Sequence, residues 1–253
     1  MTTLLKTPRP GISRTTLLTV LQPWREVDEG IHRRLAHLAE PSAEQETLWI
    51  GCGAGRSPLW WAERYGGHMH GVDADAGAIE QAEQSARWAG LAERVLFQTA
   101  EPVNLPHEDQ TFDLVVLNGL YVNAADAQAV IGEAARVVRP MCAVVAILPT
   151  WLQVPPAADA GRMARLGLSP HQLVEWKQLL RDAGLVDLAV DEAAADGGWL
   201  AHGASGALAR AWRAARWRGL VAVVSEPARA LRRLVRQRAL GLALVKGMRW
   251  PHR

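Results

Sequence analysis

The chain has 253 residues, which is enough for one α/β domain of ordinary size with additions at its ends. Hydrophobic residues make up 49% of it and charged residues 21%, a composition that excludes an intrinsically disordered chain. The two cysteines, Cys52 and Cys142, are too few for a disulfide framework and form no CxxC metal spacing. We therefore expect one globular domain without a metal, in a reducing, cytoplasmic setting.

No segment is typical of export or of membrane insertion. The first 14 residues lack an apolar core followed by a small-residue cleavage site, so we expect no signal peptide. The longest charge-free stretch, Pro140–Ala158, is interrupted by Pro149, Pro155 and Pro156, whereas a bilayer span needs unbroken backbone hydrogen bonding. We therefore predict no transmembrane helix there.

The predicted elements alternate between helices and strands along the chain. A leading helix over residues 28–39 places Ile31, Leu35 and Leu38 at helical spacing. The run 113–117 is too apolar to alternate, as expected for a central strand that is buried on both faces. The other predicted strands are 47–50, 69–72, 95–97, 142–148 and 185–190, and the other predicted helices are one ending at Tyr65, then 76–88, 126–138 and 169–183. This order predicts a parallel sheet with helices on both faces.

Two boundaries near the end of this series rest on particular residues. Ser169 is the predicted N-cap of its helix, Pro170 is its first residue, and Gly184 closes it. A seventh, antiparallel strand would have to come from Gly198–Ala204, although that segment is rich in glycine.

The segment Thr47–Gly55, with the sequence TLWIGCGAG, is a predicted strand that enters a glycine-rich turn before a helix. Such a turn lets the backbone approach a ligand, and we expect free N–H groups at the helix start for an anionic group. A dinucleotide fingerprint, GxGxxG, would need a small residue where this chain has Arg56. An oxidoreductase that uses a nicotinamide cofactor is therefore disfavoured.

Four segments in this order resemble the class I S-adenosylmethionine-dependent methyltransferases. Together they span residues 47–148, and four segments are far more specific than one glycine turn. They are Gly51-x-Gly53-x-Gly55, Asp73 at the end of the second strand, Ala100-Glu101-Pro102-Val-Asn-Leu105-Pro106 with Phe112-Asp113-Leu-Val-Val116, and Ala135-Arg136-Val-Val-Arg139-Pro140. The resemblance implies a Rossmann-like, mostly parallel α/β sheet of seven strands.

By that resemblance, nine residues would bind S-adenosylmethionine. Asp73 would hold the two ribose hydroxyls, Ala74 would lie along the adenine, and Glu101 would lie near the adenine amino group. Asn118, at the end of the fourth strand, would lie beside the reacting methyl. The implied set is Gly51, Cys52, Gly53, Gly55, Asp73, Ala74, Ala100, Glu101 and Asn118. No catalytic residue is identified, because methyl transfer needs alignment and only sometimes a base.

The chain departs from the family pattern at two places. Trp49 stands where the family usually has Asp, and Met141-Cys142 stands where it usually has Gly-Gly. Neither departure removes a glycine of the loop. Trp49 keeps open the alternative of a cofactor-binding protein without turnover.

Other candidate residues have a simpler structural interpretation. His68 and His70 alternate on a predicted strand without a further ligand, so we expect no metal there. Asn118-Gly-Leu-Tyr121 resembles the Asn-Pro-Pro-Tyr sequence of amino-methylating members but lacks both prolines. The predicted-helix residues Trp60, Trp61 and Trp88 are expected to pack in the core, and Trp24 and Trp151 are expected near the acceptor site.

The resemblance implies methyl transfer to a small-molecule acceptor, by a chain divided into three parts. These are a helical cap over 1–46, the cofactor-binding domain over 47–204 and a basic extension over 205–253. Residues 201–253 hold 12 Lys and Arg against Glu226 alone, whereas residues 1–200 hold 16 against 25 Asp and Glu. We therefore expect this extension to meet an acidic surface.

Two basic amphipathic helices are predicted in this extension, separated by Pro227. The second would present Leu231, Leu234, Val235, Leu242 and Val245 on one face. The helices would pack against the acidic body or a second copy of the chain. One alternative is peripheral contact with an anionic membrane. Contact with RNA is a less favoured alternative, because the sequence has no recognisable RNA-binding module.

Overall fold

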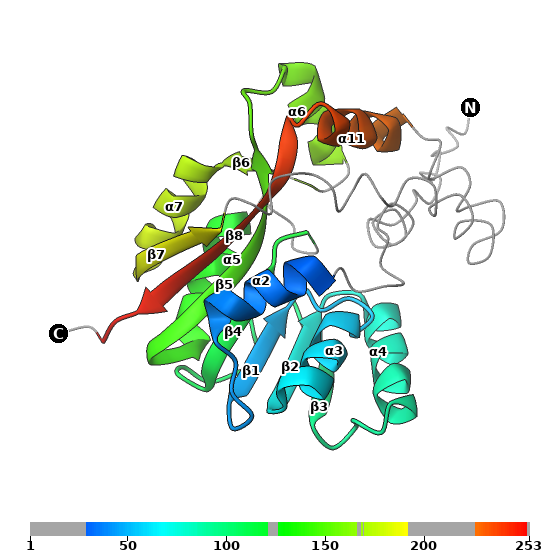
Figure 1. Ribbon diagram of the computed structural model, residues 1–253, viewed down its shortest axis with the longest axis vertical. Helices are drawn as coiled ribbons and strands as arrows, with labels where there is room; N and C mark the ends of the chain where they lie inside the picture. The colour runs from blue at the N-terminus through cyan, green and yellow to red at the C-terminus, as the bar shows by residue number, and fades with distance from the viewer. Residues whose placement is uncertain (1–28, 121–125, 166–167, 169, 192–225, 252–253) are drawn as a thin grey trace, which may run out of the picture.

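A mixed β-sheet forms the centre of the computed structural model, which describes residues 29–120, 126–165, 168, 170–191 and 226–251. The strands follow the order β3-β2-β1-β4-β5-β8-β7, with the two-residue β6 beside β5. Figure 1 shows these strands with the helices around them. The strands are β1 (Glu46–Ile50), β2 (His68–Asp73), β3 (Val95–Thr99), β4 (Phe112–Asn118), β5 (Val138–Trp151), β6 (His171–Gln172), β7 (Leu185–Asp191) and β8 (Leu240–Arg249). The predicted Rossmann-like α/β sheet, mostly parallel, is confirmed.

Helices cover both faces of the sheet, because successive side chains of each strand point to opposite sides. On β1, Trp49 packs on the face that carries α2, whereas Leu48 and Ile50 pack on the face that carries α5. The first face also holds α3, α4, α6 and α11, and the second also holds α7. The helices are α2 (Glu29–Ala39), α3 (Arg56–Tyr65), α4 (Ala76–Trp88), α5 (Ala127–Val137), α6 (Ala157–Arg165), α7 (Leu173–Asp182) and α11 (Glu226–Arg236).

The strand beside β5 differs from the one expected from the sequence. β8 runs antiparallel to both β5 and β7, and it comes from Leu240–Arg249. The residues predicted for this strand, 198–204, lie outside the described part of the chain. Assigning Leu242 and Val245 to a helix is wrong, because a short apolar run fits a buried strand and a helix face equally well.

The basic helix before β8 is real but shorter than predicted. α11 ends at Arg236, and its Leu231 and Leu234 are buried against the sheet and α6. In Figure 1, α11 and α6 lie beside each other near the carboxyl end of β5. Asp159 of α6 accepts hydrogen bonds from Arg233 and Arg162, so the helix meets an acidic partner within the chain. The other predicted helix, near residue 212, lies outside the described residues.

This packing bears on the predicted membrane contact. The apolar side of α11 is occupied by the protein, so this side is not available to a bilayer. In the described ranges, no helix is both long and apolar enough to cross a membrane. Contact through exposed arginines stays a prediction.

Two helix boundaries also correct the sequence analysis. α7 starts at Leu173 and not at Pro170, because residues 171–172 pair with Thr150 and Trp151 as β6, and the predicted N-cap Ser169 lies outside the described residues. The N-cap of α7 is Gln172, whose backbone N–H donates to the Glu175 side chain at 2.7 Å. Trp88, at the end of α4, is 79% exposed, so the prediction that it packs in the core is wrong.

Candidate functional site

The glycine loop lies where β1 ends and α3 begins, at the carboxyl edge of the sheet. Gly51, Gly53 and Gly55 all have positive φ angles, of 74°, 53° and 78°. L-residues with a side chain rarely adopt such angles, so this turn depends on glycine. The loop therefore has the geometry that the sequence predicted.

Backbone donors within the loop are used inside the protein, whereas the free N–H groups expected at the start of α3 stay a prediction. The N–H groups of Gly51 and Cys52 both donate to the Val72 carbonyl, at 2.9 and 3.1 Å. The N–H of Gly55 donates to the Cys52 carbonyl at 3.1 Å. A ligand at this loop would therefore meet a shaped backbone surface rather than these donors.

Asp73 connects the end of β2 to the glycine loop. Its Oδ2 accepts a hydrogen bond from the Gly53 N–H at 2.8 Å, and its Oδ1 accepts one from the Asp75 N–H at 3.0 Å. The side chain of Asp75 in turn caps α4 by accepting from the N–H groups of Gly77 and Ala78. The carboxylate and the loop therefore form one hydrogen-bonded unit, with Asp73 6% exposed.

Gly55 has a packing role as well as a conformational one. A Cβ at this position would lie 2.6 Å from Phe97 Cζ and 2.7 Å from the Ala82 methyl. The absence of a side chain therefore lets the loop pack directly on β3 and α4. This requirement holds whether or not Gly55 lines a ligand.

The remaining predicted site residues differ in how they join this unit. The N–H of Ala100 donates to the Asp73 carbonyl at 3.0 Å, which places the end of β3 beside the loop. Asn118, at the end of β4, is buried, and its Oδ1 accepts from the Leu120 N–H at 3.3 Å. Ala74 and Glu101 are exposed. The roles predicted for these residues stay predictions.

The thiol of Cys52 lies inside the loop and has no sign of a nucleophile. Burial, and then the negative charge of Asp73, raise its pKa well above the ordinary value. Its Sγ lies 3.6 Å from the Gly53 carbonyl, to which the thiol donates. Cys52 is therefore a neutral packing residue.

The sequence analysis missed His32, a residue of the leading helix α2. This side chain is 2% exposed, and its Nε2 lies 2.9 Å from Ser57 Oγ at the start of α3. The imidazole also stacks on Trp49, which comes two residues before Gly51 at the end of β1. No sequence pattern pointed to it, because the contact joins residues that are 25 positions apart.

His70 and Trp151 are both held by local structural contacts. His70 Nε2 lies 3.4 Å from a Glu46 carboxylate oxygen, and its ring packs edge-on against Phe112. Within the described ranges, no group of three or more His, Cys, Asp or Glu is placed to hold a metal ion. Trp151 is buried in the same core cluster as Met163 and Leu168. Its burial gives no support to the prediction that it lies near the acceptor, which stays a prediction.

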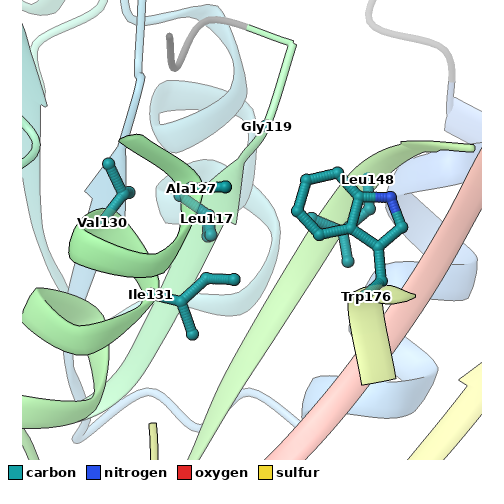
Figure 2. Close-up of a pocket in the computed structure, with 7 residues that line it drawn as sticks. All are labelled: Leu117, Gly119, Ala127, Val130, Ile131, Leu148 and Trp176. Atoms are coloured by element: carbon teal, nitrogen blue, oxygen red, sulfur yellow. The ribbon is translucent and has the colours of Figure 1, made fainter. Parts of the chain in front are cut away.

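An apolar hollow lies on the α5 face of the sheet, beside the ends of β4 and β5. Figure 2 shows its lining residues, which are Leu117, Gly119, Ala127, Val130, Ile131, Leu148 and Trp176. The ring of Trp176 is fixed because its Nε1 donates to the Pro149 carbonyl at 2.9 Å. None of the nine predicted residues lines this hollow, so it is distinct from the glycine loop and Asp73.

Comparisons with known proteins agree on one family. Residues 48–141 match the family described as "Methyltransferase domain". The 27-O-demethylrifamycin SV methyltransferase of Amycolatopsis mediterranei is 34% identical over 160 residues, which cover 60% of this chain and 58% of that protein. The chain spans about half the length of the curated relatives that it matches.

Solved structures share the fold over nearly the whole chain. The cyclase SpnF has a TM-score of 0.75 with 18% identity, covering 95% of this chain and 98% of that chain. A geranyl diphosphate methyltransferase in complex with S-adenosylmethionine has a TM-score of 0.69 with 18% identity, covering 96% and 93%. At such identities the likeness shows the fold alone.

Proposed function

We propose that this chain is a class I S-adenosylmethionine-dependent methyltransferase that transfers a methyl group to a small-molecule acceptor, because residues 48–141 match the methyltransferase domain family and a methyltransferase of Amycolatopsis mediterranei is 34% identical to it. The observation that carries the proposal is the bond between Asp73 and Gly53, which holds an acid and the glycine loop together. The acceptor class is supported by the relative from Amycolatopsis mediterranei, whose name specifies a small molecule.

The residues present fit the cofactor in shape and in charge. The two oxygens of Asp73 accept from the N–H groups of Gly53 and Asp75, and a carboxylate is the kind of group that can accept from two ribose hydroxyls. Its position at the carboxyl end of a parallel strand is where α/β sheets bind ligands. We assign Asp73 to the ribose, and the turn at Gly51 and Gly53 to the chain that leads to the sulfonium.

When bound, S-adenosylmethionine supplies a methyl group on a positively charged sulfur, which an acceptor atom can displace directly. The protein then has to align the acceptor and exclude water. Asn118 lies buried at the end of β4, beside the loop that follows. We propose that this strand end faces the reacting methyl, and we assign no residue as a general base.

Replacement of Asp73 tests the cofactor site. Asp73→Ala removes charge-assisted bonds, which should cost about 2–3 kcal/mol, or roughly 30- to 150-fold in the Kd for S-adenosylmethionine. Isothermal titration of the purified chain measures this change. Asp75→Ala is the matched control, because it removes the cap of α4 but keeps the carboxylate of Asp73. An unchanged Kd for folded Asp73→Ala would contradict the proposed site.

Cofactor binding without turnover is the second candidate function. It is favoured by Trp49, which stands fully buried where the family usually has Asp, and by the cyclase among the proteins of this fold. Incubation with metabolite extracts and a labelled methyl donor separates the two candidates. A labelled product that requires Asp73 supports methyl transfer, whereas binding without any product supports the second candidate.

A further inference from the structure

The N-terminal helix α2 contacts the glycine loop region from outside the matched domain of residues 48–141. The contact is made by His32, whose Nε2 lies 2.9 Å from Ser57 Oγ. Ser57 is itself 5% exposed, and it lies two positions after Gly55 in the first turn of α3. The bond between two buried side chains therefore reaches the end of the loop from which α3 starts.

The same imidazole contacts the strand that leads into the loop. Its ring and the Trp49 ring are nearly parallel, at 16°, with centroids 6.2 Å apart. The Trp60 ring meets it edge-on, at 68° and 5.3 Å. Because Trp49 comes two residues before Gly51 and Ser57 comes two residues after Gly55, His32 touches both flanks of the loop.

Trp49 explains why the loop needs such a brace in this chain. An indole N–H is a donor only, so Trp49 cannot accept hydrogen bonds as a carboxylate can. Its Nε1 is buried without a hydrogen-bond partner among the described residues. At this strand position the loop is therefore supported by ring packing, and the bond between His32 and Ser57 adds to the polar support that Asp73 and the Val72 carbonyl give the loop.

We propose that His32 is a positioning residue that holds the glycine loop in its cofactor-binding shape. The proposal rests on the proposed function for its ligand, but the brace itself does not need a ligand. A loop that is already ordered does not lose conformational freedom on binding, so the brace increases affinity for S-adenosylmethionine. The structural reason is that one side chain from α2 joins β1 to α3 across the loop.

Titration of S-adenosylmethionine into four variants tests the effect on affinity. Loss of one buried hydrogen bond changes an equilibrium constant by up to about ten-fold, so His32→Leu and Ser57→Ala should each raise the Kd about ten-fold. His32→Gln places an amide nitrogen near the position of Nε2 and should restore most of the affinity. Leu35→Ala is the matched control, because Leu35 is fully buried one turn further along α2 and has no part in the bond to Ser57.

The thiol of Cys52 reports on the loop without any ligand, because it is buried within the loop. In a Cys142→Ser background, His32→Leu should raise the rate at which a thiol reagent modifies Cys52 about ten-fold. Leu35→Ala should lower the melting temperature at least as much while leaving that rate within about two-fold of the parent.

The outcomes separate this inference from the proposed function. A folded His32→Leu variant with the parent Kd and the parent Cys52 rate would overturn the brace. Equal effects of Leu35→Ala and His32→Leu would also overturn it, because they would indicate general destabilisation. Failure of the parent chain to bind S-adenosylmethionine, with a Cys52 rate that still depends on His32, would overturn the proposed function and leave the brace standing.

Discussion

Gly55→Ala should destabilise the protein more than an ordinary substitution of glycine in a left-handed turn. The φ angle of Gly55 is 78°, and a Cβ there would lie 2.6 Å from Phe97 and 2.7 Å from Ala82. Gly90, just after α4, has a similar φ of 69°, but a Cβ there would meet nothing within 4 Å. The two positions therefore share the conformational cost and differ in the steric one.

The two costs can be estimated separately. A residue with a side chain in the left-handed region costs about 1–2 kcal/mol, and this cost applies to both variants. Overpacking adds about 1–3 kcal/mol at Gly55, because Phe97 and Ala82 must both move. We expect a loss of about 1–2 kcal/mol for Gly90→Ala and of about 2–5 kcal/mol for Gly55→Ala.

Urea unfolding followed by circular dichroism measures both values, and a chain of this size should lose roughly 2–4 °C in melting temperature per kcal/mol. Phe97→Leu in the Gly55→Ala background removes the ring atoms of the clash and should recover part of the loss, although the Ala82 contact remains. Equal losses in Gly55→Ala and Gly90→Ala would refute the packing argument for Gly55.

Two further predictions concern β8 and His107. A chain that ends at Gly203 lacks β8, so the edge of β5 that faces β8 loses its partner from Ala143 to Trp151. This chain should aggregate or lose cooperative unfolding, and a monomeric peak with the parent melting temperature in gel filtration and calorimetry would contradict this. Burial, then the nearby His70 and Arg136, lower the pKa of His107 from its ordinary 6.5. The unfolded chain then binds a proton at a higher pH than the folded chain, so His107 lowers the free energy of unfolding as the pH falls below about 6.5. In urea unfolding, the free energy of unfolding of the parent should therefore fall relative to that of His107→Leu between pH 7.5 and pH 5. A difference that stays constant with pH would exclude this contribution.

The sequence predicted the elements whose signals are local. β4 is a buried apolar run, as predicted, and α2 lies within one residue of its predicted start. The glycine pattern 51-53-55 and the acid at Asp73 also meet in the structure as the family resemblance implied. These features depend on spacing along the chain, which the sequence displays directly.

The errors arose where a contact partner decides the conformation. Leu242 and Val245 are compatible with a helix face by spacing, yet they form β8 because β5 and β7 offer hydrogen bonds on both of its sides. The absence of a side chain at Gly247 also lets β8 pack closely on β7, because a Cβ there would lie only 3.0 Å from Leu185. The sequence also did not indicate that the N–H groups of Gly51 and Cys52 bond to the Val72 carbonyl, because Val72 lies on the next strand.

By itself, the sequence determined the order of strands and helices from α2 to β5, the glycine turn and the acid at the end of β2, because each depends on residues that are close in the chain. Only the tertiary structure decided which strand completes the sheet, how the loop donors are paired and which distant side chain braces the loop. Those features depend on pairs such as His32 with Ser57 and Asp159 with Arg233. A hydrogen bond between such residues depends on their distance in space, and only the folded chain sets that distance.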